Sequence, residues 1–221
     1  DFQYERACVG FNLAAALSHA ASVQKTADAD GLRAACQLFQ QAAGALESVR
    51  AIVRASEWRA CPADLSAEAL DAWRALMLAQ AQRCFFERAS RDQKQSALVA
   101  KLAVQVSKYY DEAVRKMRSL KHVEHRGWLG TAEMLAKLYE AWAHHHAAAS
   151  HEAAFEYGAQ VARLDRALAL ATEAAESVRG LSKSALPADA QATLGETASV
   201  IADAHAAARR GNDFVYHERV P

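Results

Sequence analysis

The chain has 221 residues, and its 26 basic and 26 acidic side chains give a formal net charge of zero. This balance argues against a nucleic-acid-binding domain, which usually carries a strong positive charge. Hydrophobic residues make up 52% of the sequence, while glycine (9) and proline (3) are scarce, so the composition favours a folded and mostly helical chain.

Apolar periodicity predicts seven long helices joined by short turns. They cover residues 2–25, 30–56, 73–89, 90–120, 128–149, 151–178 and 187–210. The first helix should bury a broad apolar face that includes Tyr4, Phe11 and Ala15, and the second should follow an N-cap at Asp28 or Asp30. Long antiparallel helices without a βαβ unit indicate an elongated all-α array.

Capping signals mark several helix ends. Ser90 can cap the fourth helix with its hydroxyl, and Gln93 completes a capping box. Gly180 and Gly211 fit C-terminal caps of the sixth and seventh helices, and Pro187 suits the first turn of the seventh. The tail that follows lacks a helical period but holds three large apolar residues, which we expect to pack back on the body.

The fourth predicted helix carries two apolar stripes, and one neighbouring helix cannot cover both. The first stripe consists of Val99, Ala103, Val106 and Tyr110. The second consists of Leu98, Leu102 and Tyr109, turned about 80° from the first. The first stripe should face the core. The second is covered either by a further helix or by a partner, and the sequence leaves both alternatives open.

The most metal-like group is His144-His145-His146 with His151-Glu152. Three consecutive histidines on a helix point in three directions, whereas zinc needs three or four converging ligands. HExxH, GxSxG and glycine-rich phosphate loops are absent, so we expect no catalytic residue, no metal and no cofactor. The four cysteines form no CxxC pair and should be free thiols of a reduced, cytoplasmic protein. No apolar run is long enough to predict a membrane span.

Basic residues gather around the turn between the third and fourth predicted helices. They are Arg83, Arg88, Arg91, Lys94 and Lys101. One interpretation is a solvated charged face. The other is an apolar groove with a basic rim, in which Phe85, Leu98 and Leu102 bind an amphipathic helix that carries acidic residues.

Four segments carry a resemblance to a known family. They are YERACVGFNLAAALSHAA (4–21), LMLAQAQRCFFERASRDQKQSALVAKLA (76–103), YGAQVARL (157–164) and NDFVYHERVP (212–221). In this order they resemble the Bro-one (BRO) domain of Alix, fungal PalA, the histidine-domain tyrosine phosphatase and rhophilin. The second segment is most similar to Alix and PalA.

The resemblance implies a banana-shaped helical solenoid with a tetratricopeptide-like core. It also implies that residues 1–221 form a single fragment of the domain, without its β-containing N-terminal part and its C-terminal end. The implied function is an adaptor that binds the C-terminal amphipathic helix of an ESCRT-III subunit, a charged multivesicular body protein. The adaptor would recruit this subunit in endosomal sorting, multivesicular body formation and membrane scission.

The resemblance also assigns partner-binding residues. They are Phe85, Arg88, Leu98, Leu102, Asp30 and Arg33, with Ala29 as the alternative to Asp30. Tyr216 matches a tyrosine that Alix-like proteins offer to a Src-family kinase, and a packed tail tyrosine is the alternative.

For the whole protein, the resemblance implies a cytoplasmic location, recruitment to endosomes and peripheral contact with their membrane. A Rho-signalling or pH-sensing scaffold of the rhophilin or PalA kind is the alternative function. An enzyme built on the histidine cluster is the third hypothesis.

Overall fold

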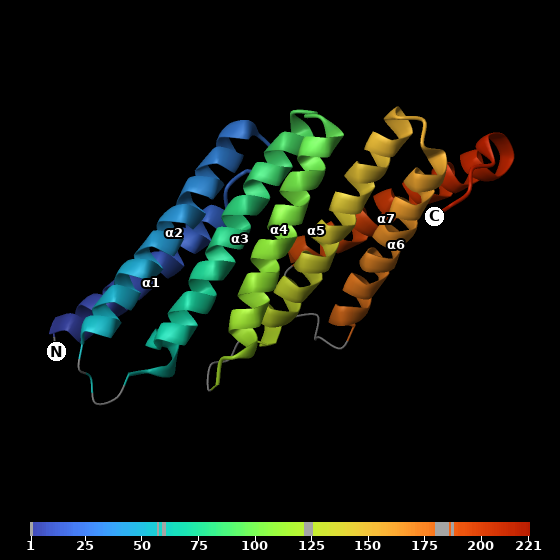
Figure 1. Cartoon of the computed structure of the whole chain (residues 1–221). Coiled ribbons are helices and arrows are strands. Elements are labelled where there is room, and N and C mark those ends of the chain that lie inside the picture. The colour runs from blue at the N-terminus through green and yellow to red at the C-terminus, as the bar shows by residue number, and fades with distance from the viewer. Residues whose placement is uncertain (1, 57, 59–60, 122–125, 180–185, 187) are drawn as a thin grey trace. The chain divides into compact units, whose positions relative to one another are not determined.

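The structure is a computed structural model that describes residues 2–56, 58, 61–121, 126–179, 186 and 188–221. Over these residues the chain is helical and contains no strand, which confirms the all-α prediction (Figure 1). The elements are α1 (Phe2–Ser22), α2 (Ala29–Ala55), the 3₁₀ turn η1 (Ala63–Leu65), α3 (Ala67–Arg91), α4 (Ser96–Arg118), α5 (Arg126–Ala153), α6 (Tyr157–Val178), α7 (Ala188–Gly211) and the π-helical turn η2 (Asn212–Tyr216).

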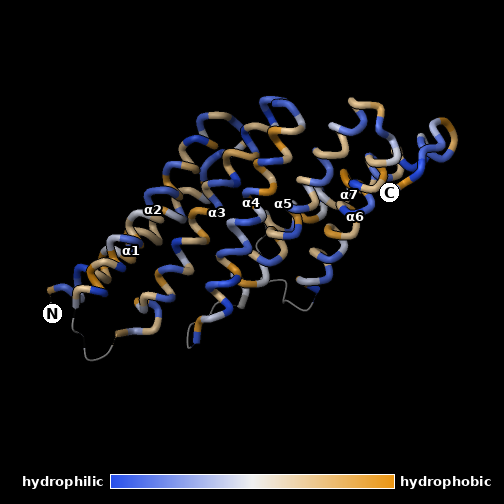
Figure 2. The backbone as a smooth tube through the Cα atoms, viewed as in Figure 1, coloured by the Kyte–Doolittle hydropathy of each residue, from blue (hydrophilic) through white to orange (hydrophobic). Residues whose placement is uncertain are grey.

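The contacts within the chain divide it into two compact units. Unit 1 comprises Asp1–Arg88 and Tyr109–His125, and unit 2 comprises Ala89–Lys108 and Arg126–Pro221. Both units are built from helices whose hydrophobic and hydrophilic positions alternate along the chain (Figure 2). That residues 1–221 form a single domain fragment stays a prediction.

In unit 1, α1 packs on α2 through a narrow stripe of small residues. Ala7, Ala14 and Ala21 are buried at a spacing of seven residues. A Cβ atom at Gly10 would lie 2.7 Å from Cγ2 of Val49, so the two helices approach closely at this point. The prediction of a broad buried face on the first helix is therefore wrong, because close contact between small side chains buries only one stripe.

The start of α2 shows which aspartate forms the cap. Asp28 has an extended backbone, and its Oδ1 accepts a hydrogen bond from the backbone N–H of Gly31 at 2.5 Å. Asp28 therefore satisfies one of the free N–H groups of the first turn, as an N-cap residue should. Asp30 lies inside that turn, and its carboxylate pairs with Arg33.

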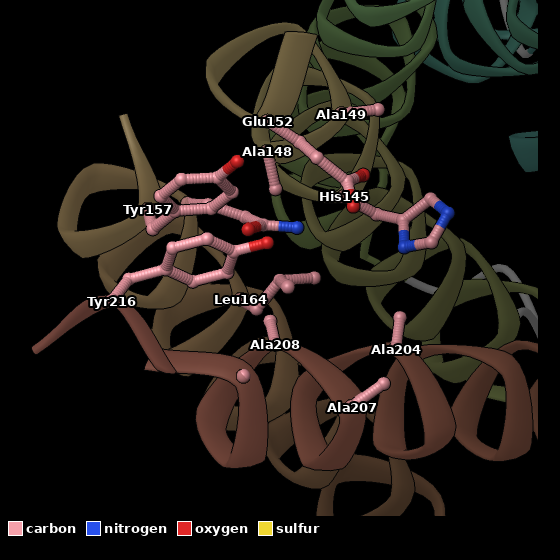
Figure 3. Close-up of a pocket in the computed structure, with 12 residues that line it drawn as sticks. His145, Ala148, Ala149, Glu152, Tyr157, Leu164, Ala204, Ala207, Ala208 and Tyr216 are labelled. Atoms are coloured by element: carbon pink, nitrogen blue, oxygen red, sulfur yellow. The ribbon is translucent and has the colours of Figure 1, made fainter. Parts of the chain in front are cut away.

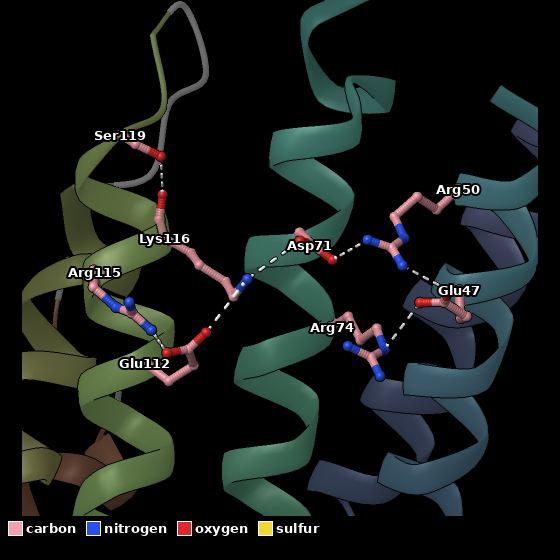
Figure 4. Close-up of polar contacts among 8 residues, drawn as sticks. All are labelled: Glu47, Arg50, Asp71, Arg74, Glu112, Arg115, Lys116 and Ser119. Atoms are coloured by element: carbon pink, nitrogen blue, oxygen red, sulfur yellow. Dashed lines mark hydrogen bonds and ion pairs between the residues drawn. The ribbon is translucent and has the colours of Figure 1, made fainter. Parts of the chain in front are cut away.

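A chain of ion pairs links α2, α3 and α4 within unit 1 (Figure 4). Arg50 donates to Asp71 Oδ1 and to Glu47 Oε1, both at 2.8 Å, and Lys116 Nζ lies 3.2 Å from Asp71 Oδ2. The hydrogen bond from Arg50 is the main cause that lowers the pKa of Glu47 below its ordinary value. Since Arg50 and Asp71 are largely buried, loss of either partner would leave a poorly solvated charge.

Two helices end differently from the prediction. Gln93 has φ 48°, and Lys94 N–H donates to the carbonyl of Ala89 at 3.1 Å, which is the Schellman arrangement at the end of α3. Ser90 lies within α3, so its predicted role as N-cap of the fourth helix is wrong: α4 begins at Ser96. The break therefore falls after Arg91 rather than at residues 89–91.

The same arrangement ends α5. Phe155 has φ 60°, and Glu156 N–H donates to the carbonyl of His151 at 2.9 Å. His151 thus belongs to the last turn of α5 and not, as predicted, to the start of the next helix. Its Nδ1 lies 2.6 Å from Oε2 of Glu156.

The two stripes predicted for α4 differ in exposure, and only the burial of the first was predicted. Every residue of the first stripe is buried: Val99, Ala103, Val106 and Tyr110. In the second stripe, Leu98 is 47% exposed and Leu102 is half-buried. The first stripe is therefore core, and the second retains accessible apolar surface.

In unit 2, α5 packs on α6, and α7 packs on both. The contact contains a buried cluster of small and branched residues: Ala141, Ala167, Leu170, Ala171 and Ile201. Trp142 Nε1 donates to Oγ1 of the buried Thr197 at 3.2 Å, which fixes α5 against α7 with a satisfied polar pair.

The end of the chain folds back on α6. Gly211 has φ −58° and continues from α7 into η2, so it is not the predicted C-cap; the left-handed residue is His217, with φ 55°. The buried Asn212 exchanges two hydrogen bonds with the backbone of Glu218. Oε2 of Glu218 then accepts the backbone N–H of Gly158 at 2.7 Å, in the first turn of α6.

These contacts confirm that the tail packs on the body, although Phe214 and Val215 remain exposed. The other two predicted end signals, Gly180 and Pro187, lie outside the described residues.

The histidine triplet lies in α5 and is partly buried. Burial lowers the pKa of His144, His145 and His146, and for His146 the pKa falls to about 4, with His145 as a second cause. The rings of His145 and His146 pack against Trp142, with centroids 5.2 and 5.6 Å from it. The imidazole rings of the triplet are therefore neutral near pH 7, and those of His145 and His146 contribute to the packing around Trp142.

We expect Gly158→Ala to destabilise the chain by about 1–3 kcal/mol. The added Cβ would lie 2.2 Å from the carbonyl oxygen of Arg219, so the tail would have to leave the first turn of α6. Urea denaturation measures the change. Gly195→Ala is the matched control, because its Cβ meets open space in α7 and should stabilise the helix by about 0.5–1 kcal/mol. Equal effects of the two substitutions would contradict the close approach.

We also expect stability to fall as pH drops from about 6.5 towards 4. In this range the unfolded chain protonates His146 while the folded chain keeps it neutral, so acid favours unfolding. The contribution is on the order of 2 kcal/mol. His146→Gln should flatten the dependence of the unfolding free energy on pH between 6.5 and 5, whereas His19→Gln, at an exposed position, should not. An unchanged slope in His146→Gln would count against this linkage.

Candidate partner-binding site

A pocket of about 230 Å³ opens between α2 and α3 in unit 1. Its lining residues are Leu32, Arg33, Cys36, Gln37 and Gln40 from α2, and Cys84, Phe85 and Arg88 from α3. It therefore combines an apolar interior with two guanidinium groups and two amides.

The helical register places these side chains together. Arg33, Gln37 and Gln40 follow one another at i, i+4 and i+7, so α2 presents them on one face. Cys36 Sγ donates to the carbonyl of Ala81 at 3.7 Å, which sets α2 against α3 below the pocket. Burial raises the pKa of Cys36, and it raises that of Cys84 to about 12, so both thiols stay protonated and act as packing groups.

Phe85 is the main apolar feature of this surface. It is 49% exposed, which is unusual for a large aromatic side chain in a helix with buried neighbours such as Cys84 and Phe86. Arg33 reaches the pocket from one helix and Arg88 from the other. This arrangement favours a ligand that carries an apolar side chain next to a carboxylate. The apolar side chain would leave water on contact with Phe85, and the carboxylate would be attracted by the two guanidinium groups.

The structure brings three of the predicted residues together: Arg33, Phe85 and Arg88 line the same pocket. Asp30 does not line it but pairs with Arg33 one turn away. Leu98 and Leu102 belong to unit 2 and lie one turn apart on α4. That these two leucines and Phe85 form one groove stays a prediction.

Sequence reasoning missed the two exposed amides that line the pocket, Gln37 and Gln40, and also Leu32. The two glutamines share the helical spacing of Arg33, and this register is the signal that could have identified them. Leu32 contributes an edge although its side chain is almost fully buried.

Tyr216 lies in η2, where its ring stacks on that of Tyr157 with centroids 3.3 Å apart and planes within 7°. The hydrogen bond between the two side chains raises the pKa of Tyr157 to about 12. Tyr216 is therefore a packed tyrosine that keeps about half of its surface accessible.

Within the described part of the chain, no group of three or more His, Cys, Asp or Glu side chains could hold a metal ion. None of the described helices has the length and apolar character of a transmembrane span.

Comparison with protein families gives one match over the whole chain. The model of the family described as "BRO1-like domain" matches residues 1–221. Human tyrosine-protein phosphatase non-receptor type 23 is 34% identical over 226 residues, which is 100% of this chain and 13% of that protein. ALG-2 interacting protein X of Dictyostelium discoideum is 33% identical over 220 residues, which is 99% of this chain and 27% of that protein.

Human programmed cell death 6-interacting protein is 30% identical over 218 residues, covering 99% of this chain and 24% of the relative. The chain thus spans between an eighth and about a quarter of the length of these relatives. The identities to the phosphatase and to the Dictyostelium protein are nearly equal, so identity does not separate the two kinds of relative.

Solved structures agree with the sequence comparison. A complex of the ALIX BRO1 domain with CHMP4C superposes with a TM-score of 0.87 at 29% identity, over 99% of this chain and 58% of that one. ALIX in complex with the SIVmac239 PYKEVTEDL late domain gives a TM-score of 0.86 at 30% identity, over 99% of this chain and 30% of that one.

Proposed function

Because the chain belongs to the BRO1-like domain family, we propose that it is an adaptor domain that binds the C-terminal amphipathic helix of an ESCRT-III subunit. The complex of a similar BRO1 domain with CHMP4C supports this proposal. The observation that carries it in this chain is the half-exposed Phe85 in a pocket flanked by Arg33 and Arg88.

The chemistry of the pocket defines the ligand. An amphipathic helix would place an apolar anchor on Phe85, with a gain of about 25 cal/mol for each Å² of apolar surface removed from water. Acidic residues beside the anchor would pair with Arg33 and Arg88, which fixes orientation and accelerates encounter more than it adds affinity. The side-chain amides of Gln37 and Gln40 would form hydrogen bonds with polar groups of the ligand.

We assign the second stripe of α4 to the same ligand. Leu98 and Leu102 follow one another at i, i+4 and keep apolar surface accessible. Large exposed apolar side chains that recur on one helix face are the usual anchor points for a partner helix. In this proposal, they extend the apolar contact beyond Phe85.

The role in the cell follows from the same proposal. The domain would recruit ESCRT-III in endosomal sorting from the cytoplasm, with peripheral contact with the endosomal membrane. Tyr216 is the proposed substrate of a Src-family kinase, and its ring would have to leave Tyr157 for its hydroxyl to enter the active site of a kinase. The chain is assigned no catalytic role.

We expect Leu98→Asp to abolish binding of ESCRT-III peptides. An unpaired carboxylate placed in an apolar contact costs several kcal/mol, enough to remove micromolar affinity. The measurement is a calorimetric titration of the purified protein with peptides from the C-termini of ESCRT-III subunits of the same organism, alongside circular dichroism.

Val104→Asp is the matched control for this titration. Val104 lies on α4, is 40% exposed and points away from the stripe of Leu98 and Leu102, six residues along the helix from Leu98. Its substitution should leave binding intact. Loss of helical signal in Leu98→Asp would identify Leu98 as a core residue. No binding by the folded wild type would favour the scaffold function in Rho signalling or pH sensing.

We expect Arg88→Ala to weaken binding mainly at low ionic strength. A charge at the rim acts over about 10 Å at 0.1 M salt and much less at 1 M, so the substitution should also reduce the dependence of affinity on salt. The titration is repeated from 0.05 to about 0.5 M NaCl. Arg54→Ala, at an exposed position near the other end of α2, should retain the salt dependence of the wild type. An equal slope in Arg88→Ala and the wild type would exclude a steering role for Arg88.

A further inference from the structure

A second pocket lies wholly within unit 2, and the proposed function does not use it. It opens between α5, α6 and α7 and has a volume of about 330 Å³, within the range of small-ligand sites. Ala204, Ala207 and Ala208 of α7 form one wall (Figure 3). The stacked rings of Tyr157 and Tyr216 lie at one side.

Two polar groups of this pocket make no hydrogen bond to the residues that the structure describes, and one of them, Nδ1 of His145, is itself buried. Gln160 is only 8% exposed, and its side-chain amide makes no hydrogen bond to any residue that the structure describes. Nδ1 of His145 is likewise buried and unpaired within the described residues. Buried polar groups are nearly always paired, because an unpaired one loses its hydration without gaining a hydrogen bond. Both groups are therefore available to a ligand.

The electrostatics of the lining favour a cation. No lysine or arginine is among the residues that line the pocket. Glu152 contributes an exposed carboxylate that makes no hydrogen bond or ion pair within the described part of the chain. Burial lowers the pKa of His145, and the hydrogen bond with Tyr216 raises the pKa of Tyr157 to about 12, so both rings are neutral near pH 7. The pocket thus offers acceptors and one negative charge.

We propose that this pocket binds an arginine side chain of a partner polypeptide. Its methylene groups fit the alanine wall, and the guanidinium group has five N–H donors for the carboxylate of Glu152, the carbonyl oxygen of Gln160 and Nδ1 of His145. Arginine is favoured over lysine because its planar group pairs bidentately with carboxylates.

The rim of the pocket indicates a polypeptide rather than a free amino acid. Phe155 lies next to Tyr157, with ring centroids 6.5 Å apart, and is 74% exposed. An exposed aromatic side chain beside a pocket can bury apolar residues that flank the inserted arginine.

The test is an NMR titration of the ¹⁵N-labelled protein with the blocked peptide N-acetyl-Leu-Arg-Leu-amide. We expect shifts of the Gln160 side-chain amide and of residues around the pocket, with a dissociation constant on the order of 1 mM for so small a ligand. The same peptide with citrulline, which keeps the shape and removes the charge, should bind at least tenfold more weakly. Free L-arginine should also bind more weakly, because it lacks the leucines.

Variants separate the pocket from general charge effects. Glu152→Gln and Gln160→Leu should each weaken binding of the arginine peptide about tenfold. Glu196→Gln removes an exposed carboxylate from α7 outside the pocket and should have no effect. Glu152 is exposed, so Glu152→Gln decides the matter if Gln160→Leu fails to fold.

Equal binding of the arginine and citrulline peptides, or full binding by Glu152→Gln, would overturn the proposal. Equal affinity for free L-arginine would overturn the assignment to a polypeptide. Shifts confined to the pocket of Phe85 would also exclude this site.

Discussion

Close contact between helices through small side chains is the constraint on which this structure depends. Ala7, Ala14 and Ala21 hold α1 on α2, and Gly10 leaves room for the methyl group of Val49. In unit 2, alanines again fill the contact between α5 and α6. Small residues allow a short distance between helix axes, but each contributes little buried area. The stability of the fold therefore depends on many helix–helix contacts, each of which buries little apolar area.

This way of packing explains why large apolar side chains remain on the surface. A narrow buried stripe leaves the rest of a helix surface without a neighbour among the described residues, and Phe85 and Leu98 lie outside the buried stripes of α3 and α4. The small size of alanine also leaves room for the second pocket, because Ala204 and Ala208 do not fill the space beside His145. Both candidate sites thus arise from the size of the residues around them, and both combine an apolar wall with charge of one sign at the edge.

The sequence was informative where local rules dominate. Asp28 was one of two candidates for the cap of α2, and the stripe of Val99 and Tyr110 was identified as core by its period alone. It was misleading at the helix ends after α3 and α5, where Gln93 and Phe155 occupy the left-handed conformation. A left-handed residue at a helix end is normally predicted from a glycine in the sequence. Another residue type adopts this conformation only where tertiary packing holds it.

The site was predictable to a similar extent. The resemblance supplied Arg33, Phe85 and Arg88, which do meet in one pocket, but periodicity gave no reason to choose them over other exposed residues. That the Gln160 amide and Nδ1 of His145 find no hydrogen-bond partner among the described residues could not be foreseen, since this depends on how three helices meet.

The bond between Glu218 and the start of α6 couples two points that are 60 residues apart in the chain. Glu156, at the usual capping position of α6, makes no capping hydrogen bond with its side chain, so the helix receives its cap from the tail. During synthesis, α6 would leave the ribosome with its first turn incomplete. At about 5–20 residues per second, the capping carboxylate follows roughly 3–12 s later. The first turn of α6 would thus receive its cap only after Glu218 has been synthesised, so the folding of unit 2 would finish after its helices have formed.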